Sequence, residues 1–92
     1  MNFIYTTYAR RRLQERYISE AWVEEIIVHG VRYRDTLSGR EVAVGRRQYL
    51  GKERDVMVAF ERKGDTIVIV TSSALKESQR ERRIQTGRWV PL

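Results

Sequence analysis

The chain has 92 residues, enough for one small domain with a single hydrophobic core. It contains no cysteine and only one histidine, which excludes a disulfide framework and a thiolate zinc site, and we expect neither a metal nor a cofactor. Its 18 Lys and Arg residues outnumber its 12 Asp and Glu residues, and the resulting net charge of +6 favours a polyanionic partner.

No apolar run approaches the roughly 20 residues that a membrane-spanning helix needs. The first residues also lack the apolar stretch of a secretory signal, so we expect a cytoplasmic protein without a membrane partner. The basic residues concentrate at the two ends: residues 1–18 hold four arginines and one glutamate, and residues 74–92 hold five basic and two acidic residues. A single basic face would require these two segments to meet in space.

The first predicted element is a short strand over residues 2–6, whose aromatic and branched side chains favour β structure. A helix follows over residues 7–17, with Thr7 as its N-cap. Apolar residues at intervals of four define the stripe that we expect to face the core: Ala9, Leu13 and Tyr17.

The same helix carries a run of basic residues. Helical spacing places Tyr8, Arg12 and Arg16 on one side of it. Guanidinium groups present fixed forks of donors that match phosphate oxygens, so this side is a candidate phosphate-binding site. A solvated basic helix is the alternative. Arg16 borders the apolar stripe, and for it a further alternative is an ion pair that ties the helix to the sheet.

A second helix is predicted over residues 20–29, with Ser19 as its N-cap and Gly30 as a left-handed stop. Its apolar stripe consists of Trp22, Val23, Ile26 and Ile27. His29, the single imidazole, lies in the last turn, where a cation complements the helix dipole. Catalysis by His29 is the alternative, but a triad also needs a nucleophile and an orienting partner.

After Gly30 the pattern changes from a helical period to alternation, which indicates strands. The turn at residues 63–65 is short enough for a tight hairpin between residues 54–62 and 66–72. The run 66–71 is apolar on both sides, so we expect helices on one of its faces and another cover on the opposite face. The economical result is an α+β fold with a short N-terminal strand and two helices packed on an antiparallel sheet of three to four strands.

Residues 74–92 depart from this pattern, and we treat them as a basic C-terminal extension of a domain over residues 1–73. Residues 74–84 are strongly charged and could form an exposed helix. The chain then ends in the apolar sequence Trp89-Val90-Pro91-Leu92, which would be unusual in solvent. This terminus docks either on its own sheet or on another copy of the chain; we favour the second alternative, which predicts a homodimer.

The N-terminal part of the chain carries one extended motif, which reads Ile4-Tyr5-Thr6-x-Tyr8-Ala9-x-x-Arg12-x-x-x-Arg16-Tyr17-Ile18-Ser19 and continues to Val23 and Gly30. It resembles the family called domain of unknown function 4258, which opens with Thr-x-His-Ala-x-x-Arg-x-x-x-Arg-x-Ile-Ser and ends in strands rich in branched residues. That family is similar to the BrnT and RelE-type toxins. The resemblance covers about residues 3–73 and implies a RelE-like fold of the barnase, EndoU, colicin and RelE group.

The resemblance implies a toxin-like, metal-independent endoribonuclease, in which a ribose 2′-hydroxyl attacks its own phosphate. Arg12 and Arg16 would then stabilise the phosphorane, and Tyr8 would serve as acid, base or base-stacking platform. Tyr8 stands where the family has histidine, and tyrosine is the poorer general base at neutral pH. Further nucleic-acid contacts are assigned to three arginines: Arg11, Arg46 and Arg47.

The expected partners are RNA, the ribosome and an antitoxin protein. Two other functions remain open. The first is a catalytically degenerate module of the same fold that binds RNA or protein, and the second is an oligomeric interaction protein whose basic helix contacts an acidic partner. RNA cleavage without divalent metal distinguishes the enzyme from both, and salt-sensitive RNA binding without cleavage indicates the binding module.

Overall fold

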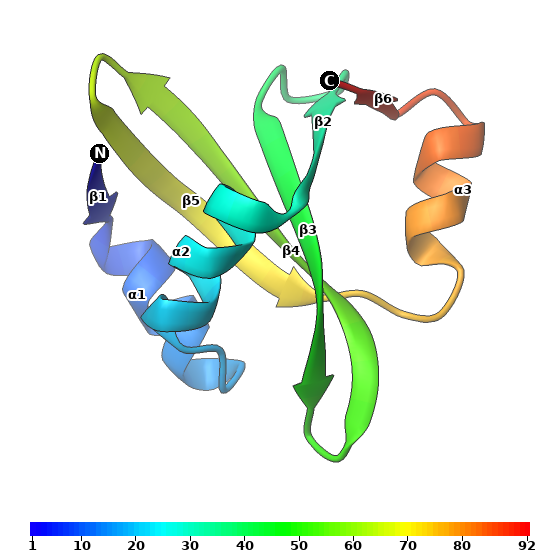
Figure 1. Ribbon diagram of the computed structural model, residues 1–92, viewed down its shortest axis with the longest axis horizontal. Helices are drawn as coiled ribbons and strands as arrows, with labels where there is room; N and C mark the ends of the chain where they lie inside the picture. Colours follow the sequence, from blue (N-terminus) through cyan, green and yellow to red (C-terminus); the bar gives the residue numbers. More distant parts are fainter.

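Six strands form one mixed sheet, and helices lie on both of its faces (Figure 1). The computed structural model describes residues 1–92. In chain order the elements are β1 (Asn2–Tyr5), α1 (Thr7–Glu15), α2 (Glu20–His29), β2 (Val31–Asp35), β3 (Glu41–Tyr49), β4 (Lys52–Lys63), β5 (Thr66–Ala74), α3 (Gln79–Gln85) and β6 (Trp89–Pro91). The order across the sheet is β1-β5-β4-β3-β2-β6, and every neighbouring pair is antiparallel except β1 and β5.

The expected fold is wrong in its number of strands and in their directions. We expected two helices on an antiparallel sheet of three to four strands, whereas three helices accompany a six-stranded mixed sheet, so strands make up 46% of the chain and helices 28%. The fold is therefore a sheet-rich α+β fold. Two pairings cause most of the difference: β1 joins β5 in parallel, and β6 joins β2. Both strands are very short and pair with distant segments, so local periodicity does not reveal where they go.

The sheet separates two apolar cores. Alternate residues of β4 point to opposite faces, so Val56 and Val58 enter one core and Met57 enters the other. The first core lies under α1 and α2 and contains Ala9, Leu13, Ile18, Val23, Ile26, Ile27, Ala43, Val56, Val58, Phe60, Ile67 and Ile69. The second core lies on the opposite face and contains Tyr33, Val42, Val44, Met57, Ala59, Leu75 and Trp89. The expected cover on both faces of β5 is confirmed, because Ile67 joins the first core and Val70 packs against the second.

A hydroxyl side chain caps the N-terminus of each longer helix. Thr6, not the expected Thr7, caps α1 and accepts a hydrogen bond from the Ala9 N–H at 3.0 Å. Ser19 caps α2 as predicted and accepts from the Trp22 N–H at 3.1 Å. Both helices thus begin where a short polar side chain satisfies a free N–H group.

None of the three helices combines the length and the apolar character needed to cross a bilayer.

Two expectations about helix ends are wrong. α1 ends at Glu15, so Tyr17 falls out of the helical phase and is 73% exposed, with a φ of 57°, instead of facing the core. Gly30 ends α2 in an extended conformation (φ −74°, ψ 171°) and not in a left-handed one. A Cβ at residue 30 would clash with Ile26 O and would lie 2.6 Å from Val44 O, so this glycine is required because α2 and β3 approach closely.

The C-terminal extension folds back onto the sheet of its own chain. α3 lies on the side of the second core, and β6 pairs with β2 at the edge (Figure 1). Trp89 is only 1% exposed and stacks on Tyr33, with ring centroids 5.4 Å apart. Docking on its own sheet is therefore the alternative that the structure shows for Trp89. A homodimer through the exposed Val90 and Leu92 stays a prediction.

Replacement of Gly30 by alanine should destabilise the protein strongly, because the new methyl group would meet two carbonyl oxygens below van der Waals distance. We expect a loss on the order of 3 kcal/mol in the free energy of unfolding, measured by urea denaturation. Gly39→Ala is the matched control: Gly39 has a φ of +77° but no atom within 4 Å of the added Cβ, so the loss should be about 1–2 kcal/mol. Equal losses would contradict the steric role of Gly30.

Candidate nucleic-acid interface

The predicted phosphate-binding residues of α1 come together only in part. Tyr8 is exposed, and the guanidinium carbon of Arg12 lies 5.9 Å from the centre of its ring, a cation–π contact. Arg12 also forms an ion pair with Glu15 (Nη1–Oε1 3.3 Å), and its buried Nε has no hydrogen-bond partner. Tyr8, Arg12 and Arg16 line none of the three pockets with volumes of about 830, 400 and 290 Å³. A catalytic role for Tyr8 and Arg12 stays a prediction.

Arg16 ties α1 to the sheet. Its Nη1 donates to Ser72 O at 2.6 Å and to Thr71 Oγ1 at 3.4 Å, both on β5. Its own carbonyl oxygen accepts a hydrogen bond from the Tyr49 hydroxyl at 2.5 Å. The link is thus made by hydrogen bonds to neutral groups and not by the ion pair considered above. With one terminal nitrogen held by the backbone, Arg16 is less free than Arg12 to bind a ligand, and its catalytic role stays a prediction.

The three arginines assigned to nucleic-acid contacts lie in different environments. Arg11 is exposed on α1. Arg47 lies beside α2, where its Nη2 pairs with Glu25 Oε2 at 3.1 Å. Its neighbour Arg46 starts toward the opposite face of the sheet, because successive strand residues alternate between faces, and it lines the largest pocket; both arginines also line a smaller pocket with His29 and Arg80.

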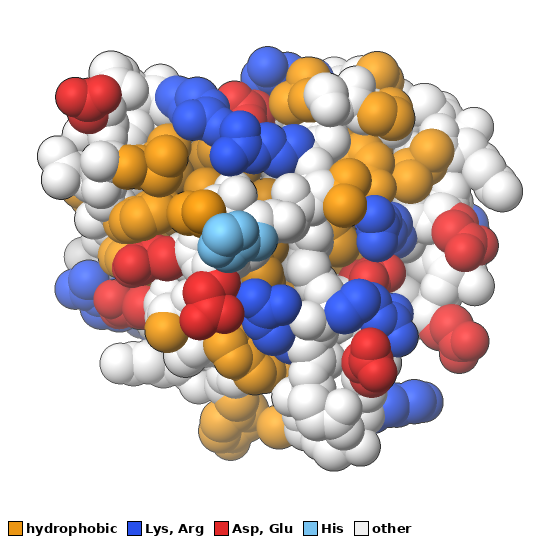
Figure 2. Space-filling model, viewed as in Figure 1, with side chains coloured by type: hydrophobic (Ala, Val, Ile, Leu, Met, Phe, Trp, Pro, Cys, Tyr) orange, Lys and Arg blue, Asp and Glu red, His pale blue; other side chains and the backbone are white.

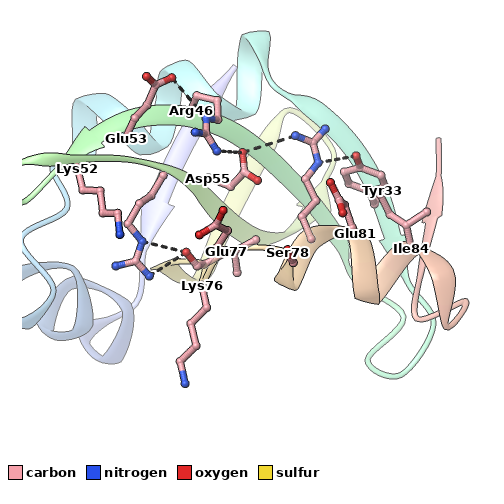
Figure 3. A pocket seen from close by; sticks show the side chains of 13 residues that line it. Tyr33, Arg46, Lys52, Glu53, Asp55, Lys76, Glu77, Ser78, Glu81 and Ile84 are labelled. Carbon is pink, nitrogen blue, oxygen red and sulfur yellow. Dashed lines mark hydrogen bonds and ion pairs between the residues drawn. The ribbon is translucent and has the colours of Figure 1, made fainter.

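The largest pocket lies between the β3–β4 hairpin and α3, on the side of the second core (Figure 3). It has a volume of about 830 Å³. Nine of its lining residues are charged: Arg46, Lys52, Arg54, Lys76 and Arg80 are basic, and Glu53, Asp55, Glu77 and Glu81 are acidic. No group of three or more His, Cys, Asp or Glu side chains is arranged so that it could hold a metal ion.

A carboxylate held between two guanidiniums forms the floor of this pocket. Asp55 Oδ1 lies 3.5 Å from Arg46 Nη1 and 3.6 Å from Arg80 Nη1, and it has no hydrogen-bond partner. The Nε of Arg80 donates to the Tyr33 hydroxyl at 2.9 Å, with the guanidinium carbon 5.6 Å from the ring centre. Figure 3 shows how these contacts connect α3 with β2, β3 and β4. We call these four residues the Arg46–Arg80 cluster.

Each guanidinium of the Arg46–Arg80 cluster keeps a nitrogen free. Arg46 uses Nε toward Glu53 and Nη1 toward Asp55, and Arg80 uses Nε toward Tyr33 and Nη1 toward Asp55, so both Nη2 atoms lack a partner. All nine ion pairs of the chain use arginine, so Lys52 is also unpaired. The pocket therefore presents the two Nη2 atoms and the Lys52 ammonium as free donors. An anionic ligand can accept hydrogen bonds from them without breaking an existing contact.

Asp35, at the end of β2, binds Arg88 and Trp89, the residues that follow α3, and so holds this part of the chain against the sheet. Asp35 is 5% exposed and accepts hydrogen bonds from the backbone N–H groups of Leu37 and Ser38 and from Trp89 Nε1 at 3.2 Å. Burial acts to raise the pKa of Asp35, but the hydrogen bonds from Ser38, Leu37 and Trp89 and the charge of Arg88 lower it below its ordinary value. Asp35 thus fixes the end of the extension that carries Arg80.

Sequence reasoning missed Tyr33, Asp55 and Arg80 as members of one site. Arg46 was among the predicted nucleic-acid contacts, which stay a prediction, and its alternation with Val42 and Val44 was a signal that it shares their face. Arg80 lies in the extension, outside the part of the chain that carries the family resemblance. Its contacts depend on where α3 packs, and no local pattern determines that position.

Comparison of the chain with protein-family models, with curated proteins and with solved structures found no match to any of them. Functional conclusions therefore rest on the geometry of the chain's own residues.

Arg16→Ala should destabilise the protein by about 1–3 kcal/mol, because it leaves the Ser72 carbonyl without its side-chain donor. The free energy of unfolding from urea titration measures this loss. Arg11→Ala on the exposed side of the same helix is the matched control and should change stability by less than about 0.5 kcal/mol. Similar values for both variants would show that the contact with β5 contributes nothing.

Asp35→Asn should weaken the attachment of the extension, since an amide nitrogen would face the Trp89 and Arg88 donors. We expect a loss of about 1.5–3 kcal/mol at pH 7. The depressed pKa of Asp35 means that the wild-type carboxylate contributes stability above the ordinary Asp value and loses it as the pH falls through the lower folded value. The difference between the two proteins in urea denaturation should therefore shrink in acid. A difference that is independent of pH would contradict this role.

Proposed function

We propose that this protein binds RNA in the pocket beside the Arg46–Arg80 cluster and cleaves it there as a toxin-like, metal-independent endoribonuclease. The observation that carries the proposal is the meeting of two guanidiniums with free Nη2 atoms and a phenol hydroxyl at one open pocket. Planar guanidinium groups match the oxygens of a phosphate, and a basic chain favours a polyanion. The net charge of +6 is consistent with such a partner.

The existing contacts of the pocket suit a phosphate. Asp55 already places one carboxylate oxygen between Arg46 and Arg80, at distances of 3.5 and 3.6 Å that are longer than strong charge-assisted hydrogen bonds. A phosphate accepting from the two free Nη2 atoms would add shorter contacts and leave Asp55 in place to hold the arginines apart. The carboxylates of the pocket limit its affinity for anions in general, which favours a ligand held at several points along its length.

The proposed reaction needs no co-reactant. The ribose 2′-oxygen forms a bond to phosphorus while the bond from phosphorus to the 5′-oxygen breaks, which leaves a 2′,3′-cyclic phosphate and a 5′-hydroxyl. The 2′ proton passes to the carboxylate of Glu81, which lines the same pocket as Tyr33 (Figure 3). The leaving 5′-oxygen takes its proton from the Tyr33 hydroxyl, which Arg80 holds by donating to its oxygen. Arg46 and Arg80 stabilise the charge on the phosphorane.

RNA binding without cleavage is the second candidate function. The position of His29 favours this second candidate. His29 is the only histidine, and it is exposed at the end of α2 and does not line the largest pocket. Figure 2 shows His29 in pale blue, beside acidic and basic side chains on the face that carries α2. Acid and base catalysis in the pocket would have to rely on a phenol and carboxylates alone.

Purified protein in EDTA should convert single-stranded RNA into fragments that end in 2′,3′-cyclic phosphate. Arg80→Ala should lower the cleavage rate by about 100-fold or more, because it removes a donor to the phosphorane and releases Tyr33. Arg82→Ala is the matched control on the same helix, since Arg82 is exposed and does not line the pocket. Fragment ends are read by mass spectrometry, and circular dichroism checks that each variant is folded.

The outcomes separate the alternatives. Intact RNA with the wild-type protein would overturn the enzyme, and salt-sensitive binding of that RNA would then support the second candidate. Cleavage that survives Arg80→Ala but is abolished by Tyr8→Phe or Arg12→Ala would place the site on α1 instead, where Tyr8 and Arg12 are in contact.

A further inference from the structure

Tyr17 has a conformation that its side chain does not favour. It follows α1 with a φ of 57°, in the left-handed region that glycine adopts without strain and a bulky residue rarely adopts. Burial of the ring does not offset the strain of this backbone conformation, because Tyr17 is 73% exposed. Strained backbone conformations cluster at functional sites, which makes Tyr17 a candidate for a role beyond the fold.

Leu50 repeats this combination in the turn of the β3–β4 hairpin. The turn consists of Leu50 and Gly51, with φ values of 49° and 80°, between the paired residues Tyr49 and Lys52. Two-residue turns with two positive φ angles favour asparagine, aspartate or glycine at the first position. Leu50 is nevertheless 68% exposed, so the fold gains no buried apolar surface from it.

One hydrogen bond brings these two residues to the same end of the molecule. The Tyr49 hydroxyl donates to Arg16 O at 2.5 Å, which holds the hairpin against the connection between α1 and α2. Tyr17 and Leu50 are the next residues along the two segments. In Figure 1 this connection and the hairpin turn both lie at the lower end of the molecule. Lys52, two residues beyond Leu50, lines the largest pocket and forms no ion pair.

We propose that Tyr17 and Leu50 form a platform on which an unpaired base of the RNA stacks as the strand leaves the pocket past Lys52. The inference rests on the proposed function and specifies its substrate as single-stranded RNA. A duplex cannot present a base face in this way, because its bases are already paired and stacked.

The size and the surroundings of the platform favour a nucleobase over a protein partner. A stable protein interface uses roughly 20–30 residues on each side, whereas one aromatic ring is sufficient to stack one base. Lys52 supplies an unpaired cation between the platform and the pocket, where a phosphate of the same strand would pass. One RNA strand could thus follow the hairpin, with a base on the platform, a phosphate at Lys52 and the next phosphate in the pocket.

Tyr17→Gly tests the platform, because it removes the ring and the backbone strain together. The thermal midpoint should rise by about 4–8 °C. The affinity for a fluorescent single-stranded oligouridine with 2′-O-methyl riboses, which cannot undergo 2′-hydroxyl attack, should fall about 10-fold in fluorescence anisotropy. Tyr17→Phe keeps the ring and should bind like the wild type. Leu37→Ala removes an exposed leucine from the β2–β3 loop and should also leave affinity unchanged.

Each result decides between defined alternatives. A more stable Tyr17→Gly protein with weaker binding supports the platform. Wild-type affinity in Tyr17→Gly, or equally tight binding of duplex RNA, overturns the platform and leaves RNA binding intact. A wild-type protein that does not bind the oligouridine overturns the proposed function, and the platform with it.

Discussion

The arrangement of the whole protein depends on β4 being buried on both of its faces. Val56, Val58 and Phe60 enter the core under α1 and α2, while Met57 and Ala59 enter the opposite core. β4 also has hydrogen-bonded neighbours on both sides, β3 and β5, along most of its length. One strand therefore anchors two layers of side chains. The helical side holds the larger core, with 12 buried residues against seven, and the pocket lies on the other side, beside α3.

The arginines explain why a basic chain has only a few places where an anion could bind. Most of the 18 basic residues already have an internal partner, as Arg62 has in Glu41 and Arg10 has in Glu20. The pKa of Glu41 is lowered mainly by its hydrogen bond from Arg62, which outweighs the opposing effect of burial. Net charge thus indicates a kind of partner but does not locate the contact, and the cations that remain free at the pocket are more informative than the total.

The sequence predicted the elements best where a side chain acts on its own backbone. The Ser19 cap, the stripe of α2, the Ala9 and Leu13 positions of the α1 stripe and the tight turn before β5 depend on neighbours in the chain, and the structure confirms them; Tyr17 was wrong because α1 ends before it. The parallel pairing of β1 and the addition of β6 depend on distant partners, and the expected sheet was wrong for that reason. For the site, Arg46 was identified from its charge and position, whereas its link to Arg80 required the path of the extension. Gly30 was correctly predicted to end the second helix. Glycine is required there because a Cβ would clash with the Val44 carbonyl, and not because the φ angle is positive.

The guanidinium of Arg16 also affects how this sheet can meet other molecules. β1 pairs with β5 only from Thr66 to Ile69, so the remainder of β5 has no strand beside it on that side. Such an unpaired edge is a template for strands of other chains. Arg16 already donates to Ser72 O within this stretch, and at the far edge Pro91 lacks the N–H that an added strand would need. Arg16 and Pro91 thus each hinder strand addition at one place on the sheet, the uncovered part of β5 and the outer side of β6.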